Sequence, residues 1–216
     1  MDKLYQFIVN PTNDYLGHTL AYIELCLASI VLAMVIGVVL GAVVSRSPLL
    51  AFLAVNISGL MRAIPVIAFL VAVLPYLGLG FLPALIALTV LGIPPILLNT
   101  YTGIRGISPA TIDAARGIGM TTGQIITRIQ TPLVLPIIAA GVRTSAVQII
   151  ATATLAAIIG AGGYGEYILS GLYQLDNVQI LAGAIPVALL ALLAEVLLSQ
   201  LQRALTPEGL RVREVS

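Results

Sequence analysis

The sequence predicts an all-α polytopic membrane protein, with five transmembrane helices in one domain that covers residues 1–216. Hydrophobic residues make up 59% of the chain and charged residues only 9%, with a mean hydropathy of +1.08. These values lie far outside the range of soluble globular domains. Most charges fall in short segments between long apolar stretches, and the net charge of +1 gives no reason to expect a nucleic-acid partner. We therefore expect membrane lipid to surround the chain.

Five stretches are long and apolar enough to cross a bilayer, because a spanning helix needs about 20 mostly apolar residues. The third stretch carries no charge, and the others carry one charged residue each: Glu24, Arg62, Arg143 and Glu195, in chain order. The spans are expected at about residues 17–44, 49–79, 81–104, 133–159 and 178–201.

Arginine placement predicts the orientation, because basic residues near span ends accumulate on the cytoplasmic side. If the N-terminus lies outside and the C-terminus in the cytoplasm, the arginines share the inner side, with Arg62 placed near the start of the second span. They are Arg46, Arg62, Arg105, Arg116, Arg128, Arg203, Arg211 and Arg213. The sequence thus predicts a multi-pass membrane protein with its N-terminus outside and its C-terminus in the cytoplasm.

The charged segment 108–132 between the third and fourth spans reads as two short helices joined by a glycine elbow. Ser108 and Pro109 are typical of a helix start, with serine as the capping side chain. The first helix should stop near residues 117–119, where glycine can adopt the left-handed conformation. Thr121 and Gln124 have the spacing of a capping box that opens the second helix. We expect a docking element on the cytoplasmic face, with a plain surface linker as the alternative.

Residues 160–165 (GAGGYG) match G-x-G-x-x-G literally, but an apolar span precedes them in place of the strand that a dinucleotide site needs. The chain has no G-x-x-x-x-G-K-[ST] loop, one cysteine (Cys26) and one histidine (His18), so no metal site is expected. We expect no cofactor bound by this chain and no catalytic residue. If nucleotide hydrolysis drives its function, a separate subunit performs it.

Within segment 108–132, the residues Asp113-Ala114-Ala115, Gly119, Ile129 and Pro132 have a recognisable spacing. They resemble the E-A-A-x-x-x-G-x9-I-x-L-P signature of the membrane subunits of bacterial ABC importers. Aspartate replaces the glutamate of that signature, and Thr131 replaces its leucine. The resemblance implies that these six residues belong to coupling helices that seat in a cleft of a cytoplasmic ATPase.

Further stretches narrow the resemblance to permeases of osmoprotectant importers, which carry glycine betaine, carnitine, choline or proline betaine. These stretches are residues 94–106, 140–145, 160–168 and 205–210. The resemblance implies the MetI-like permease fold and a transport subunit that is not an enzyme. It also implies a place in the plasma (cytoplasmic) membrane of a bacterium. Methionine or an ergothioneine-like betaine remains an alternative solute. A proton-coupled secondary carrier using Glu24 or Glu195, and a nontransporting scaffold, are alternatives from other classes.

The same resemblance implies the partners. They are a cytoplasmic ABC ATPase dimer that binds ATP and Mg, a second permease copy or a close paralogue, and an extracytoplasmic solute-binding protein or domain. Five helices cannot enclose a polar path alone, and a symmetric pair is the commonest way to build one.

Polar residues inside the spans are the candidates for the translocation path. Ser145, Gln148 and Thr152 recur at i, i+3 and i+7, so they share one face of the fourth span. We expect this face to line the path, and Asn99 and Arg62 are weaker candidates. The alternative is a set of hydrogen bonds between helices, which membrane proteins use routinely in packing.

Arg143 and Glu195 lie at similar depth if the fourth span rises from the cytoplasmic side and the fifth descends to it. An unpaired charge at that depth costs about 3 kcal/mol even on the most forgiving insertion scale. We therefore predict that the two side chains pair or share a polar network. The alternative is that each reaches the nearer interface by snorkelling.

Overall fold

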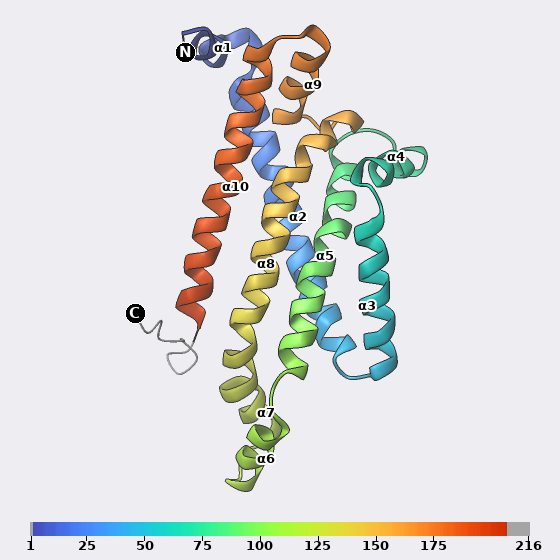
Figure 1. The fold of residues 1–216 in the computed structure, drawn as a ribbon, viewed down its shortest axis with the longest axis vertical. Coiled ribbons are helices and arrows are strands. Elements are labelled where there is room, and N and C mark those ends of the chain that lie inside the picture. The colour runs from blue at the N-terminus through green and yellow to red at the C-terminus, as the bar shows by residue number, and fades with distance from the viewer. Residues whose placement is uncertain (1, 207–216) are drawn as a thin grey trace.

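The computed structural model describes residues 2–206, which form helices and connecting turns without a strand. Four long helices, α2, α5, α8 and α10, run along the longest axis, and Figure 1 shows α3 alongside them and most of the shorter elements toward the two ends. The elements are α1 (Asp2–Val9), η1 (Pro11–Asn13), α2 (Tyr15–Val44), α3 (Pro48–Ala63), α4 (Val66–Leu77), α5 (Phe81–Arg105), α6 (Pro109–Gly117), α7 (Thr122–Ile125), η2 (Ile126–Gln130), α8 (Thr131–Ala153), η3 (Thr154–Ile159), α9 (Tyr164–Gln174) and α10 (Asn177–Leu205).

The predicted all-α membrane fold is confirmed. Four helical stretches among the described residues are long and apolar enough to cross a bilayer: Pro11–Val44, Phe81–Arg105, Thr122–Ile159 and Asn177–Leu205. The α3–α4 pair supplies a fifth span if its two halves are taken together. The bounds agree with the predicted spans to within a few residues at most ends.

The second predicted span, 49–79, is not one straight helix. It is broken into α3 and α4, which are bent by 97°. Ile64 between them is extended (φ −76°, ψ 123°) because a residue before proline is sterically excluded from the helical region. Pro65 also lacks the N–H that would continue the helical hydrogen bonds. The Ile64-Pro65 pair therefore ends α3 within the span.

Small residues let α2 and α5 pack closely. Ser29, Ala33, Gly37 and Gly41 recur every four residues on one buried face of α2. A Cβ atom at Gly37 would lie 2.8 Å from the Cβ of Ile96, and one at Gly41 would lie 2.5 Å from the Cβ of Thr100. Both partners advance by four residues, so the two helices run parallel, with the close backbone approach typical of membrane helices.

Glycines also fix the antiparallel packing of α5 against α8. A Cβ at Gly141 of α8 would lie 2.9 Å from the carbonyl oxygen of Pro95 on α5. Gly92, earlier on α5, faces the later residues Ser145 and Ile149 of α8, whereas Gly103 faces the earlier residue Val134. Helix α5 is thus the centre of the bundle, with α2 on one side and α8 on another.

The two ends of the bundle carry different charges. In Figure 1 the C-terminal ends of α2, α5 and α10 point toward the end of the bundle that carries α6 and α7. Basic residues gather there, whereas the N-terminus, α9 and several acids lie at the opposite end. The basic residues at the α6–α7 end are Arg46, Arg105, Arg116, Arg128 and Arg203, and the acids at the other end are Asp14, Glu166 and Asp176. Arg211 and Arg213 lie outside the described residues.

Arg62 departs from the predicted distribution. It was expected near the cytoplasmic start of the second span, but it lies one residue before the end of α3, at the break. Helix α3 begins at Pro48, so Arg62 is about 21 Å further along the helix at 1.5 Å per residue. It therefore does not belong with the arginines of the α6–α7 end.

Candidate coupling segment and translocation path

The α6 helix begins at Pro109, as predicted, but Ser108 does not cap it with its side chain. The backbone carbonyl of Ser108 accepts a hydrogen bond from the N–H of Thr111 at 3.0 Å, and the hydroxyl makes no capping hydrogen bond. Ser108 is exposed, so water can serve the free N–H groups of the first turn. Pro109 has no N–H to satisfy and holds the φ that a helix needs.

Gly119 ends α6 in the predicted left-handed conformation, with φ of +83°. Its N–H donates to the carbonyl of Arg116 at 2.9 Å, and the N–H of Met120 donates to the carbonyl of Ala115 at 3.1 Å. These two bonds form a Schellman motif, which satisfies carbonyls that the helix end would otherwise leave free. The glycine elbow predicted from the sequence is confirmed.

The predicted capping box that opens α7 is also confirmed. The N–H of Gln124 donates to the hydroxyl of Thr121 at 3.3 Å, and the N–H of Thr121 donates to the side-chain carbonyl of Gln124 at 2.9 Å. Each residue satisfies a donor of the other, which fixes the direction in which α7 leaves the elbow.

The sequence predicted that the second helix is a separate short element, and this prediction is wrong. The helix continues through η2 into α8, so that residues 122–159 form one helical stretch. The joint is a π-helical turn in which the N–H of Thr131 donates to the carbonyl of Ile126, five residues earlier. The wider turn accommodates Pro132, whose ring would clash with the carbonyl four residues before it in a regular α-helix.

Helices α6 and α7 are mostly exposed among the described residues. Ala115 and Ile125 are the buried residues of these two helices. Asp113 and Arg116 form an exposed ion pair at 3.8 Å, and the side chain of Ile118 is 80% exposed beside the glycine elbow. Ile118 thus adds one apolar side chain to the exposed surface at this end of the molecule.

The residues predicted to line the path differ in burial and in hydrogen-bond partners. Ser145 is fully buried, and its hydroxyl donates to the carbonyl of Gly92 on α5 at 2.8 Å. This is the hydrogen bond between helices that the sequence left as the alternative, so Ser145 faces α5 and not an open path. Thr152 donates to the carbonyl of Gln148 at 2.7 Å within its own helix, and both residues are partly exposed. Asn99 donates to the carbonyl of Pro95 at 2.8 Å.

Arg143 and Glu195 meet as predicted. The Nε atom of Arg143 lies 3.5 Å from Oε1 of Glu195, which joins α8 to α10. Both side chains are partly exposed in the single chain, at 31% and 46%. The contact removes the need for either charge to stand alone within a span.

Comparison with known proteins identifies the family. Residues 33–208 match the family described as "Binding-protein-dependent transport system inner membrane component". The chain belongs to this family. It is a permease subunit of ABC importers, a multi-pass membrane protein whose family works with a separate ATPase subunit.

Curated relatives cover the permease along its whole length. It is 39% identical to the carnitine transport permease protein OpuCB of Listeria monocytogenes over 98% of this chain and 97% of that one. It is 37% identical to the choline transport system permease protein OpuBB of Bacillus subtilis over 100% of both chains. It is 36% identical to the osmoprotectant import permease protein OsmW of Salmonella typhimurium over 98% of this chain and 100% of that one.

Solved structures confirm the fold. An inward-facing structure of the MetNI methionine ABC transporter has a TM-score of 0.79 at 21% identity, covering 92% of this chain and 99% of that chain. An amino-acid ABC transporter has a TM-score of 0.74 at 16% identity, covering 91% and 96%. The permease thus has the predicted MetI-like fold.

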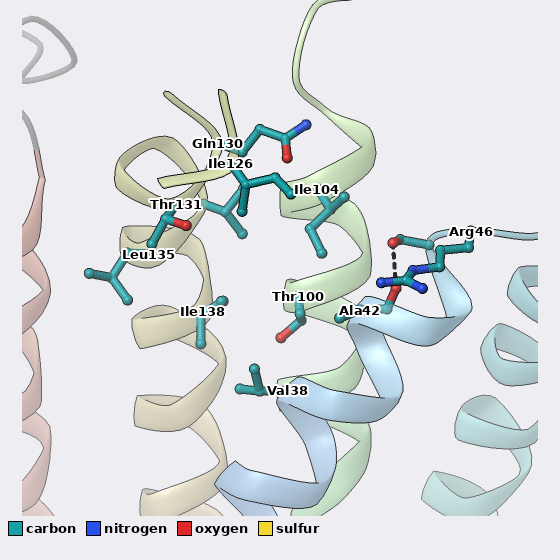
Figure 2. Close-up of a pocket in the computed structure, with 12 residues that line it drawn as sticks. Val38, Ala42, Arg46, Thr100, Ile104, Ile126, Gln130, Thr131, Leu135 and Ile138 are labelled. Carbon is teal, nitrogen blue, oxygen red and sulfur yellow. Dashed lines mark hydrogen bonds between the residues drawn. The ribbon is translucent and has the colours of Figure 1, made fainter. Parts of the chain in front are cut away.

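The permease also holds a cavity of about 460 Å³ beside the coupling segment. Figure 2 shows Ile126 and Gln130 of the π turn on one side, Thr100 and Ile104 of α5 behind them, and opposite them Ala42 of α2 with Arg46 in the turn after α2. Its walls are mostly apolar, and none of the predicted path residues lines it. The π turn is therefore loosely packed on its α2 side.

The sequence did not predict the aromatic cluster at the end opposite α6–α7. Tyr15 and Tyr167 stack at 5.6 Å between ring centroids, and Tyr22 lies 5.1 Å from Tyr164. The Tyr167 hydroxyl donates to the carbonyl of Asn13 at 2.5 Å, and burial raises the pKa of Tyr167 to about 12, so this donor stays protonated at neutral pH. The cluster holds α9 against α2. Its residues lie too far apart in the sequence to form a recognisable motif.

We expect the Glu195→Ala permease to be less stable than a variant that loses both charges, such as Arg143→Met with Glu195→Leu. The single change leaves Arg143 unpaired within the membrane, at a cost of about 3 kcal/mol. The double change removes that unpaired charge. Thermal unfolding of the three proteins in lipid nanodiscs measures the difference. Equal stability of the single and double variants would show that Arg143 reaches the interface without its partner.

Proposed function

We propose that this permease forms the translocation path of an ATP-driven importer for a small zwitterionic or quaternary-ammonium osmoprotectant, such as glycine betaine, carnitine or choline. Its end-to-end identity of 36–39% to curated permeases named for carnitine, choline and osmoprotectant transport carries the proposal. The solute-binding protein makes most of the selection, because cation–π cages that hold quaternary ammonium groups need open aromatic faces. Tyr15, Tyr22, Tyr164 and Tyr167 pack against one another and form no such open cage.

In this proposal α6 and α7 dock on a cytoplasmic ATPase dimer that binds ATP and Mg, through Asp113, Ala114, Ala115 and Gly119. Ile129 and Pro132 lie in and just after the π turn that joins the docking site to α8. The N-terminus and α9 face outward, toward the solute-binding protein or domain, and the C-terminus is cytoplasmic. The basic residues at the α6–α7 end support this orientation.

The path lies between this chain and a second copy or a close paralogue. Of the fourth-span residues, Gln148 and Thr152 remain candidates for its lining because both are partly exposed, and Asn99 is partly exposed on α5. Ser145 is left out because it is buried against α5.

We expect Gln148→Ala to lower solute uptake several-fold while the permease still assembles with its partners. The side chain of Gln148 makes no hydrogen bond within the described residues, so its loss should leave the packing of α8 intact. Uptake per assembled complex in proteoliposomes, with complex yield measured by size-exclusion chromatography, separates the two effects. Poor assembly with normal uptake per surviving complex would instead assign Gln148 to packing.

Reconstitution tests the function directly. Proteoliposomes that contain the permease, its ATPase and its solute-binding protein should take up radiolabelled glycine betaine, carnitine or choline when ATP is enclosed. Uptake should survive ionophores that collapse ion gradients, and excess methionine should not compete. Uptake that needs an ion gradient and no ATP would establish a secondary carrier, and competition by methionine would move the solute to amino acids.

A further inference from the structure

The break in the α3–α4 span lies within the predicted second span and is exposed in the single chain. Residues 62–65 are exposed, and Arg62 is about 21 Å along a span that crosses about 30 Å of hydrocarbon. The last carbonyls of α3 have no helical donors, and Pro65 offers no N–H. No backbone hydrogen bond among the described residues joins α4 to these carbonyls. Irregular backbone at this depth is tolerated where it is buried in protein or lines a water-filled cavity.

The position of Arg62 around the axis of α3 indicates which side of the helix carries its side chain. Ala51 and Ser58 are the buried residues of α3, and Arg62 follows Ser58 by four residues, so it continues the same face toward the bundle. Leu60 lies on the opposite face and is 68% exposed. The Arg62 side chain is nevertheless exposed, so no helix among residues 2–206 covers it. Arg62 thus lies on the side of α3 that is turned toward the bundle, opposite the face that carries Leu60.

Arg62 also differs in its partners from the other arginine inside a span. Arg143 pairs with Glu195, whereas no carboxylate among residues 2–206 lies within ion-pair distance of Arg62. Ionisable side chains within spans face the bundle interior or a water-filled cavity, and they commonly mark a solute pathway. A guanidinium there offers several donors in the plane that a carboxylate fits.

We propose that the break between α3 and α4 lines the solute path and that Arg62 binds the carboxylate of a solute as it passes. This rests on the proposed function and sharpens it: the path favours carboxylate-bearing zwitterions, such as glycine betaine and carnitine, over choline. Glycine betaine and choline share the trimethylammonium group and differ in carrying a carboxylate or a hydroxyl, so they form a matched pair of probes.

The first experiment compares uptake of these two solutes by Arg62→Gln and Arg62→Lys permeases, with the unaltered solute-binding protein and ATPase. Loss of a charge-assisted hydrogen bond should lower glycine betaine uptake by Arg62→Gln about tenfold. Choline uptake should change less than about twofold by the same reasoning, and Arg62→Lys should retain part of the glycine betaine uptake. An equal loss for both solutes, or no change for either, would overturn the assignment of Arg62 to the carboxylate.

The second experiment does not depend on which solute is carried. Cys26 is the single cysteine of the chain and is buried, so a Cys26→Ala protein gives a cysteine-free background. In it, Arg62→Cys should react with a membrane-impermeant thiosulfonate at least about tenfold faster than Leu60→Cys, because the reagent attacks thiolates that contact water. Equal, slow reaction at both positions would show that the break faces lipid or protein.

The two experiments distinguish the failure of this inference from that of the proposed function. If wild-type permease takes up neither solute but Arg62→Cys reacts rapidly, the break lines an aqueous path and the solute class is wrong. If wild-type permease takes up glycine betaine but Arg62→Cys stays unreactive, the importer assignment stands and the role of Arg62 is refuted.

Discussion

Replacing Gly119 with valine is expected to detach the ATPase from the permease or to uncouple it. Gly119 has a φ of +83°, and a residue with a Cβ atom in the left-handed region costs roughly 1–2 kcal/mol, with β-branched residues at a further disadvantage. The Schellman hydrogen bonds would be lost with that conformation, and the angle between α6 and α7 would change. Association with the ATPase should weaken about tenfold or more, because 1.4 kcal/mol corresponds to a factor of ten.

The neighbouring glycines provide matched controls for Gly119→Val. A Cβ atom at Gly117, Gly119 or Gly123 would meet no other atom within 4 Å, but Gly119 alone of these three has a positive φ. Gly117→Ala and Gly123→Ala should therefore keep wild-type association. Asp113→Ala should have a small effect, because its ion pair with Arg116 is exposed and such pairs contribute about 0–1 kcal/mol.

The measurements for this series are ATPase association and solute-stimulated ATP hydrolysis in reconstituted complexes. Wild-type values of both for Gly119→Val would show that residues 108–132 are a surface linker. Loss of ATPase association and of stimulated hydrolysis in Gly117→Ala and Gly123→Ala would show that the segment is sensitive to any change. The left-handed conformation of Gly119 would then not be the cause.

The second large effect is expected at Gly141, where alanine should destabilise the whole bundle. The added Cβ atom would lie 2.8 Å from the Cβ of Asn99, 2.9 Å from the carbonyl oxygen of Pro95 and 3.1 Å from the Cα of Ile96. Two of these contacts are with backbone atoms of α5, which cannot move aside without separating α5 from α8. Overpacking of this kind costs about 1–3 kcal/mol.

Gly59→Ala is the control for Gly141→Ala, and it should act in the opposite direction. Gly59 also lies within a helix, and nothing lies within 4 Å of its added Cβ. Alanine should therefore stabilise α3 by roughly 0.5–1 kcal/mol through its helix propensity. Thermal unfolding in detergent should show a midpoint about 3–10 °C lower for Gly141→Ala and unchanged or higher for Gly59→Ala. A midpoint for Gly141→Ala at or above wild type would contradict the close packing of α5 and α8.

The features that the sequence predicted correctly are those set by local chemistry. Span bounds follow from runs of apolar residues, and the capping box at Thr121 and the elbow at Gly119 follow from the conformations that those residue types prefer. The Arg143–Glu195 contact was also predictable, because two charges at the same depth in a membrane have few other partners.

The features that the sequence did not predict depend on three-dimensional packing. The spacing of Ser145 and Gln148 placed them on one face of a helix, but a face wide enough to hold both also reaches α5, where Ser145 is buried. The break at Ile64-Pro65 could have been predicted from the proline. The apolar residues on both sides of it led instead to the prediction of one continuous span. The tyrosine cluster joins residues about 150 positions apart, such as Tyr15 and Tyr167, so no local pattern reveals it.

The π turn at residues 126–130 has a consequence for the direction in which the docking site points. One residue rotates an α-helix by about 100°, so the extra residue of a π turn shifts the angular phase between α7 and α8 by that amount. The elbow is thereby turned about 100° around the axis of α8, relative to its place at the end of an uninterrupted α-helix. The cavity lies beside this turn. If α6 and α7 dock on the ATPase as proposed, a push on them would reach α8 through this offset, as rotation about its axis as well as displacement along it.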